Sequence, residues 1–319
     1  MKIYLSLLLM AAVFLTSCEK DNNLIPEEQA EKIYLAFAPL DNVVLRSTDN
    51  LPEEYAIQNL SVFLTDVVGS NTIQYSYPDI AFTPADPNPA GDTLNTKQIT
   101  IALDPATIGQ RDVYVVANYQ GTLPAITTVT QIQAIQTPEA TTTTGLPTTN
   151  GLPMYGTLLN ANLSSTSANA PALVPLTRTC AKFRVTLTYT SATYAGTNNS
   201  FTMINVPTYT LYAGNNAPPA ALITYPETAL PPMGTLQYQG VVYAYESTVM
   251  PAISINTTIN GAAKTYNITT NLPVSSRNNL YDIDVQIYPP VVASAGAPMG
   301  RAAICSNGIL LEEYLVGEE

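Results

Sequence analysis

The chain has 319 residues, a formal net charge of −12 at pH 7 and no histidine. The missing histidine excludes Ser-His-Asp and Cys-His catalysis and removes the commonest metal ligand, and the sequence has no glycine-rich phosphate loop. The acidic balance argues against nucleic-acid binding, because phosphate backbones repel such a surface. We therefore expect a protein that is not an enzyme and has no catalytic residue, no metal and no cofactor.

The first 18 residues have the three parts of a lipoprotein signal peptide. Lys2 is followed by an apolar run over 3–15 and by the tetrapeptide Leu15-Thr16-Ser17-Cys18, which resembles the lipobox. The apolar run is shorter than the roughly 20 residues that span a bilayer, so we predict a removable signal. The mature chain then begins at Cys18, which carries lipid at the outer membrane. An ordinary secretory signal with a chance cysteine is the alternative.

The rest of the chain predicts an all-β fold with a minor helix. Residues 19–29 are polar and acidic, as in a solvated tether. Beyond them, Tyr, Val, Ile and Thr dominate short periodic runs that Pro and Gly punctuate, a pattern typical of β-sandwiches. The predicted strands are 32–38, 56–65, 72–77, 97–103, 112–118, 173–176, 180–189, 201–211, 236–245, 252–259, 263–268 and 280–288, and one short helix is predicted within 126–136.

Two irregular stretches divide the chain. Residues 160–175 are small, polar and end in proline, which indicates a linker between two domains, and 289–299 precede a separate tail. The tail is apolar and needs a partner surface. It is either the last strand of its own domain or a strand given to a neighbouring molecule. The tail residues that would fill a neighbour's groove are Ile304, Ile309, Leu311, Tyr314 and Val316.

The remaining cysteines and paired carboxylates leave alternatives open. Cys180 and Cys305 either pair in an oxidising envelope or are two separate buried thiols. Asp282 and Asp284 share one face of a strand, which suits a solvated edge better than a calcium ligand pair. The adjacent pair at 53–54 lies in a proline-headed turn.

Five segments together resemble the fimbrillin family, the subunits of type V pili on Gram-negative cells. They are 112–118 (DVYVVAN), 152–156 (LPMYG), 174–185 (VPLTRTCAKFRV), 242–246 (VYAYE) and 277–283 (RNNLYDI). Each is unspecific alone, and their order and spacing carry the resemblance, to which the lipobox adds. One departure is Cys180, where such segments usually hold a plain apolar residue.

The resemblance implies a structural subunit of a cell-surface fimbria that contributes to adhesion. Such subunits have two tandem β-sandwich domains of transthyretin-like type and are exported as lipoproteins. An arginine-specific protease cuts them and removes the leading strand, and the C-terminal strands of the adjoining subunit fill the groove. In this sequence the cut falls between Arg46 and Ser47, within VVLRSTD.

The implied partners are other copies of the chain, accessory fimbrial subunits, the protease, the outer membrane through the lipid before cleavage, and an unidentified host or bacterial surface ligand. The implied division is 1–18, signal peptide and lipobox cysteine; 19–46, tether and removable leading strand; 47–165, N-terminal β-sandwich domain; 172–288, C-terminal β-sandwich domain; and 289–319, donor-strand tail.

Three further hypotheses are retained. Asp92-Thr93-Leu94 resembles a short O-glycosylation motif, which would place a glycan on Thr93. The function could also be that of a tip or anchor subunit of the same system. A third class is a monomeric surface lipoprotein that binds a glycan or a host protein through the Tyr-containing region 209–225.

Overall fold

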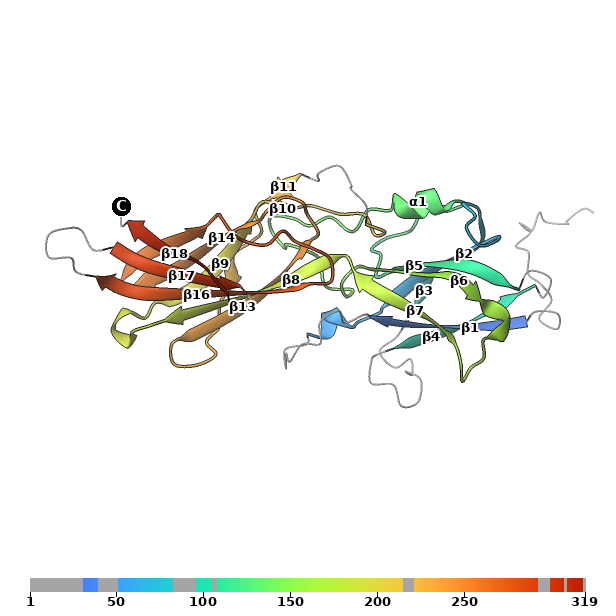
Figure 1. The fold of residues 1–319 in the computed structure, drawn as a ribbon, viewed down its shortest axis with the longest axis horizontal. Coiled ribbons are helices and arrows are strands. Elements are labelled where there is room, and N and C mark those ends of the chain that lie inside the picture. The colour runs from blue at the N-terminus through green and yellow to red at the C-terminus, as the bar shows by residue number, and fades with distance from the viewer. Residues whose placement is uncertain are drawn as a thin grey trace, which may run out of the picture.

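The computed structural model describes residues 31–39, 51–82, 96–104, 108–214, 221–291, 299–306 and 309–317. Strands dominate this part of the chain, and two groups of strands lie at opposite ends of an elongated molecule (Figure 1). The prediction of a mainly β fold with one short helix is confirmed. We call the two groups the N-terminal body, built from β1–β7 and α1, and the C-terminal body, built from β8–β18.

The elements of the N-terminal body are β1 (Glu31–Pro39), β2 (Asn59–Thr65), β3 (Ile73–Ala81), β4 (Lys97–Leu103), β5 (Gln110–Ala117), α1 (Val129–Gln133), β6 (Met154–Asn162) and β7 (Ala172–Arg178). Short 3₁₀ helices occupy Pro52–Glu54 and Leu163–Ser165. All seven strands belong to one sheet in the order β3-β2-β5-β6-β7-β1-β4.

This sheet folds back on itself. β6 pairs with β7 only over Met154–Gly156, so β3-β2-β5-β6 and β7-β1-β4 form two facing layers. Aliphatic side chains from both layers make one core, because alternate residues of each strand point to the same face. A second, smaller cluster lies on the outer side of β2 and β5, under α1.

The elements of the C-terminal body are β8 (Cys180–Tyr189), β9 (Thr197–Ile204), β10 (Val206–Pro207), β11 (Leu222–Ile223), β12 (Thr228–Ala229), β13 (Gln237–Tyr245), β14 (Ala252–Ile259), β15 (Ala262–Ile268), β16 (Leu280–Val291), β17 (Met299–Ser306) and β18 (Ile309–Gly317). A five-stranded sheet, β13-β8-β16-β17-β18, faces a four-stranded sheet, β12-β9-β14-β15, and β10 pairs with β11. Buried residues of both large sheets form the largest core.

The predicted linker is wrong in its position. β6 ends and β7 begins within 160–175, and β7 belongs to the N-terminal sheet, where it runs parallel to β1. The C-terminal body therefore does not begin at residue 172. Thr179, which is buried, joins β7 of the N-terminal body to β8 of the C-terminal body. The small polar residues form a turn instead, in which Ser167 and Ala170 exchange backbone hydrogen bonds of 3.1 Å.

Strand bounds agree with the prediction to the residue for β4, β8 and β14. The predicted strand 201–211 is split, because Asn205 takes a left-handed conformation with φ of 61° between β9 and β10. The helix lies within the predicted range 126–136 and begins with a capping box in which Thr128 and Gln131 satisfy each other's backbone N–H groups.

Candidate functional site

The leading strand β1 is an interior strand of its layer. It pairs in parallel with β7, where Leu35 lies opposite Ala172, and antiparallel with β4, where Ile33 lies opposite Ile101. Ile33, Leu35 and Phe37 have no exposed surface and point into the core between the layers. Taking β1 away would leave the facing edges of β4 and β7 without backbone partners and would open an apolar trough.

The residues predicted to be modified or cut fall outside the described part of the chain. β1 ends at Pro39 and the description resumes at Leu51, so Arg46 and Ser47 lie between them. Cys18 and Thr93 also lie outside the described residues.

The segment that follows this gap is fixed at the junction of the two bodies. Glu54 is 6% exposed. Its carboxylate accepts hydrogen bonds from Lys182 Nζ on β8 at 2.5 Å and from the Tyr243 hydroxyl on β13 at 2.7 Å. Its carbonyl accepts from Arg178 Nε at 2.8 Å. Burial, and next the bond to Glu54, raise the pKa of Tyr243 well above its ordinary value, so the hydroxyl keeps its proton and donates.

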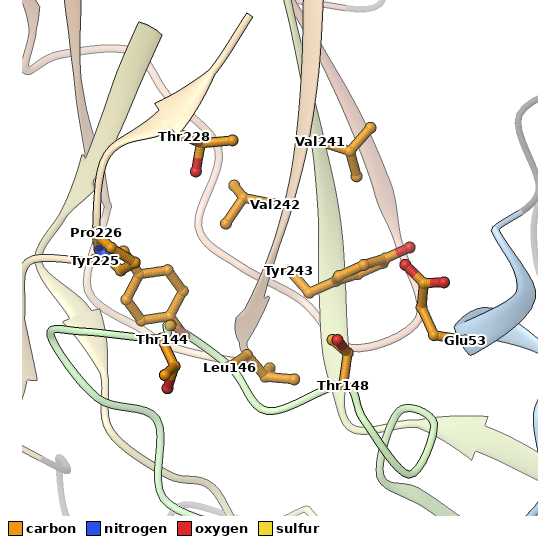
Figure 2. Close-up of a pocket in the computed structure, with 11 residues that line it drawn as sticks. Glu53, Thr144, Leu146, Thr148, Tyr225, Pro226, Thr228, Val241, Val242 and Tyr243 are labelled. Atoms are coloured by element: carbon orange, nitrogen blue, oxygen red, sulfur yellow. The ribbon is translucent and has the colours of Figure 1, made fainter.

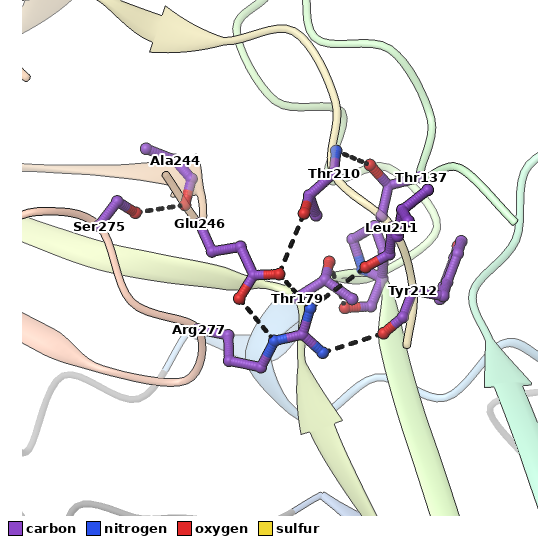
Figure 3. Close-up of polar contacts among 10 residues, drawn as sticks. Thr137, Thr179, Thr210, Leu211, Tyr212, Ala244, Glu246, Ser275 and Arg277 are labelled. Carbon is purple, nitrogen blue, oxygen red and sulfur yellow. Dashed lines mark hydrogen bonds and ion pairs between the residues drawn. The ribbon is translucent and has the colours of Figure 1, made fainter. Parts of the chain in front are cut away.

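A second set of contacts crosses the junction (Figure 3). Arg277 pairs with Glu246 through Nε at 2.8 Å and Nη2 at 2.5 Å, and it also donates to the carbonyl of Leu211 at 3.2 Å and of Tyr212 at 2.9 Å. The Tyr212 ring is fully buried in the cluster under α1, and its hydroxyl donates to the Asn118 carbonyl at 3.3 Å. A loop of the C-terminal body is thereby held in the N-terminal body.

The C-terminal tail forms a hairpin in its own sheet. β17 pairs antiparallel with β16, and β18 pairs with β17 and is the edge strand. Of the residues predicted to be donated, Ile304 lies on β17, and Ile309, Leu311, Tyr314 and Val316 lie on β18. The structure therefore places the tail as the last strands of its own body, and it brings none of these residues to β1.

Cys180 is a free and buried thiol. Burial raises its pKa to about 12, so the thiol stays protonated and unreactive. Of the two alternatives left open for Cys180, a disulfide or a separate buried thiol, the structure shows the second.

Asp282 and Asp284 do not lie at a strand edge as predicted, although both stay partly exposed to solvent. Both lie on β16, which is an interior strand between β8 and β17. Parallel pairing puts Asp282 opposite Arg184, which donates two bonds of 2.6 and 2.8 Å to its carboxylate. Burial, and then the Asp282 charge, raise the pKa of Asp284. Within the described residues no three carboxylate or cysteine side chains group as a metal site would require.

Sequence reasoning missed Glu54 as a junction residue. The Glu54 carboxylate and the Lys182 ammonium are 128 positions apart in the chain, and no local pattern links them. The sequence predicted the turn that begins at Pro52, but it did not predict that the Glu54 carboxylate binds residues of the C-terminal body.

No helix in the described part of the chain has the length and apolar character to cross a membrane. In a sequence comparison, residues 40–173 match the family described as Major fimbrial subunit protein (FimA). No curated protein matches the chain significantly.

Solved structures share the fold at low identity. The tip fimbrial protein Mfa3 from Porphyromonas gingivalis is 16% identical with a TM-score of 0.52, and the match covers 86% of this chain and 99% of Mfa3. A fimbrilin (FimA) from Porphyromonas gingivalis W83 is 13% identical with a TM-score of 0.50, covering 80% and 90%. A candidate cell-adhesion protein from Bacteroides eggerthii is 14% identical with a TM-score of 0.57, covering 86% and 95%. These likenesses confirm the β-sandwich-like fold. The family match over residues 40–173 covers less than half of the chain, and it supports the resemblance to the fimbrillin family.

Proposed function

We propose that the chain is a structural subunit of a cell-surface fimbria that polymerises by donor-strand exchange and contributes to adhesion. In this scheme the chain is exported as a lipoprotein with its lipid on Cys18 and is cut after Arg46. A C-terminal strand of a neighbouring copy then takes the place of β1. The observation that carries the proposal is the position of β1, a buried interior strand that ends at Pro39, shortly before the candidate cut.

The energy at stake is large enough to drive assembly. Burying Ile33, Leu35 and Phe37 contributes about 1.5–3 kcal/mol each, or about 5–9 kcal/mol together. A whole domain is stable by only about 5–15 kcal/mol. A subunit without β1 therefore gains much of its stability back by recruiting another strand.

The placement of the donor favours exchange between copies. β17 and β18 belong to the C-terminal body and β1 to the N-terminal body, at the two ends of the molecule (Figure 1). β18 is an edge strand, so its release breaks only the ladder with β17. A head-to-tail contact between different ends of identical copies builds an open filament when its rotation does not close into a ring.

The test starts from purified protein comprising residues 19–319, treated with an arginine-specific protease. N-terminal sequencing and an unboiled gel follow the products. The proposal expects a new N-terminus at Ser47 and a ladder of multimers. Arg46→Lys keeps the charge but should block both. A chain that ends before Ile309 should be cut and give no ladder, because it lacks the donor strand.

The same experiment separates the related roles. A tip subunit would be cut and would accept a donor, but its own C-terminal strand would not be used. An anchor would not be cut after Arg46. A monomeric surface binder would give no multimers under any treatment, which would overturn the proposal.

A further inference from the structure

A pocket of about 230 Å³ lies beside the junction of the two bodies (Figure 2). Its lining comes from the first 3₁₀ helix, the loop before β6, the segment around β12, and β13. The lining residues are Glu53, Thr144, Gly145, Leu146, Thr148, Tyr225, Pro226, Thr228, Val241, Val242 and Tyr243. Sites for drug-sized molecules start at about 300 Å³, so this pocket has room for one long side chain rather than for such a ligand.

The pocket opens on the edge of β13. This strand ends the five-stranded sheet and has β8 as its single ladder partner there. Successive side chains of a strand point to opposite faces. Val242 lies on one side of β13 and Val241 and Tyr243 on the other, and all three line the pocket (Figure 2). A pocket that touches both faces of one strand lies at the edge of that strand.

The register shows which backbone groups point into this opening. In an antiparallel ladder, residue pairs alternate between those that exchange hydrogen bonds and those whose N–H and C=O point outward. Tyr189 donates its N–H to the Leu236 carbonyl across β8 and β13, whereas Lys182 donates to Asn279, away from β13. Lys182 lies opposite Tyr243, so the Tyr243 backbone groups point outward.

The same alternation makes the backbone N–H and C=O of Val241 point outward. The preceding outward position is Gln239, and its N–H donates to the Pro231 carbonyl at 3.0 Å, as the alternation requires. The turn at 231–234 thus covers the first part of the edge, and its backbone bonds to β13 stop at Gln239. No hydrogen bond joins the outward groups of Val241 and Tyr243 to another residue that the structure describes.

The charge and the walls of the pocket define what can occupy it. Glu53 is the one charged residue in the described lining. The neighbouring Glu54 carboxylate is already bound by Lys182 and Tyr243. Three threonines also line the pocket, and the apolar side chains of Leu146 and Pro226 suit the methylene stem of a long cationic side chain.

We propose that this pocket binds an extended peptide segment that carries a lysine or an arginine. The segment pairs as an added strand with the outward groups of Val241 and Tyr243, and its cation meets the Glu53 carboxylate. Backbone pairing gives such sites their affinity, and the pocket for one side chain gives them specificity. This site is separate from β1, and it binds its peptide whether or not β1 is exchanged.

The probe is the capped peptide acetyl-Val-Thr-Lys-Thr-Val-amide, titrated into the uncut chain of residues 19–319. Backbone amide shifts in nitrogen-15 NMR spectra report the site and the dissociation constant. We expect the Val241 and Tyr243 amides to shift, and the peptide with norleucine in place of lysine to bind about tenfold more weakly. Glu53→Gln should abolish that difference. Glu139→Gln, which removes an exposed charge outside the pocket, should leave it unchanged.

A second pair of variants tests the strand pairing. Val241→Pro removes an N–H that the ladder with β8 does not use, and proline is tolerated at such edge positions. Val241→Ala shortens the same side chain and keeps the N–H. The peptide should not bind Val241→Pro and should still bind Val241→Ala. In both variants, backbone amides far from residue 241 should keep their positions in the NMR spectrum of the unaltered chain, which shows that the fold is intact. Equal binding by the two variants would overturn the added strand, and equal binding of the lysine and norleucine peptides to the unaltered chain would overturn the role of Glu53. If Val241→Pro fails to fold, the Glu53 variants still decide.

Discussion

Leu35 on β1 and Leu64 on β2 form a matched pair that tests strand exchange. Both are fully buried in the same core, between the two layers of the N-terminal body. Replacing a buried leucine by alanine costs about 2–5 kcal/mol, from lost burial and from the cavity that remains. In the uncut chain, Leu35→Ala and Leu64→Ala should therefore lower the free energy of unfolding by similar amounts, measured by urea denaturation followed by circular dichroism.

After cutting and assembly, the two variants should differ. β1 has left with its Leu35, whereas Leu64 still faces the strand that replaces β1. Multimers of Leu35→Ala should then withstand heating in detergent as well as unaltered multimers, and those of Leu64→Ala should dissociate at a lower temperature. The first variant should also form multimers faster, because its β1 leaves more easily. If both variants weaken the multimers equally, β1 remains in the fibre and the proposed exchange is wrong.

Three other substitutions probe the interior. Glu54→Ala should lower the free energy of unfolding by about 3–5 kcal/mol, since it removes the carboxylate from a buried ion pair, and combining it with Lys182→Met should recover much of that loss in urea denaturation. Because burial raises the pKa of Asp284 above its ordinary 3.8, the native state binds more protons than the unfolded state just above pH 3.8, and stability falls as pH rises there. Asp284→Asn should consequently raise the melting temperature at pH 7 but not at pH 3, and an equal change at both would contradict the assignment. Gly196→Ala should cost about 1–3 kcal/mol or more, because its Cβ would lie 2.1 Å from Thr257 Oγ1; a neutral result would show that this buried contact yields easily.

The fold class was readable from the sequence because β-branched and aromatic residues alternate over short runs. β4, β8 and β14 could be bounded to the residue, since each is flanked by residues that do not continue the alternation. β6 was missed because Asn160 and Asn162 near its end are exposed and polar, and Asn160 has a φ of 55°. The sheet membership of β7 could not be read at all. It depends on parallel pairing with a strand more than a hundred residues earlier, which no local pattern encodes.

Some features of the candidate site could likewise be predicted from the sequence, and others could not. A lipobox, an arginine in a polar stretch and an apolar tail are local features, so the sequence could suggest them. Whether β1 is an edge or an interior strand depends on the partners at β4 and β7, and only the sheet order answers that. The junction of Glu54 with Lys182 and the outward groups of β13 likewise follow from register between distant segments.

The hydrogen bonds of residues 53–58 hold the N-terminal body together when β1 leaves. The segment after the candidate cut is tied down independently of β1. The Glu53 carbonyl accepts from Leu152 N–H at 3.1 Å, and the Asn118 side chain donates to the Ala56 carbonyl at 2.7 Å and accepts from Gln58 N–H at 2.9 Å. Since none of these bonds involves β1, its loss need not unravel the chain toward β2. The side chains of β2 and β5 that line the trough then stay in place. An incoming strand therefore binds a core that is already formed and lacks only the strand β1.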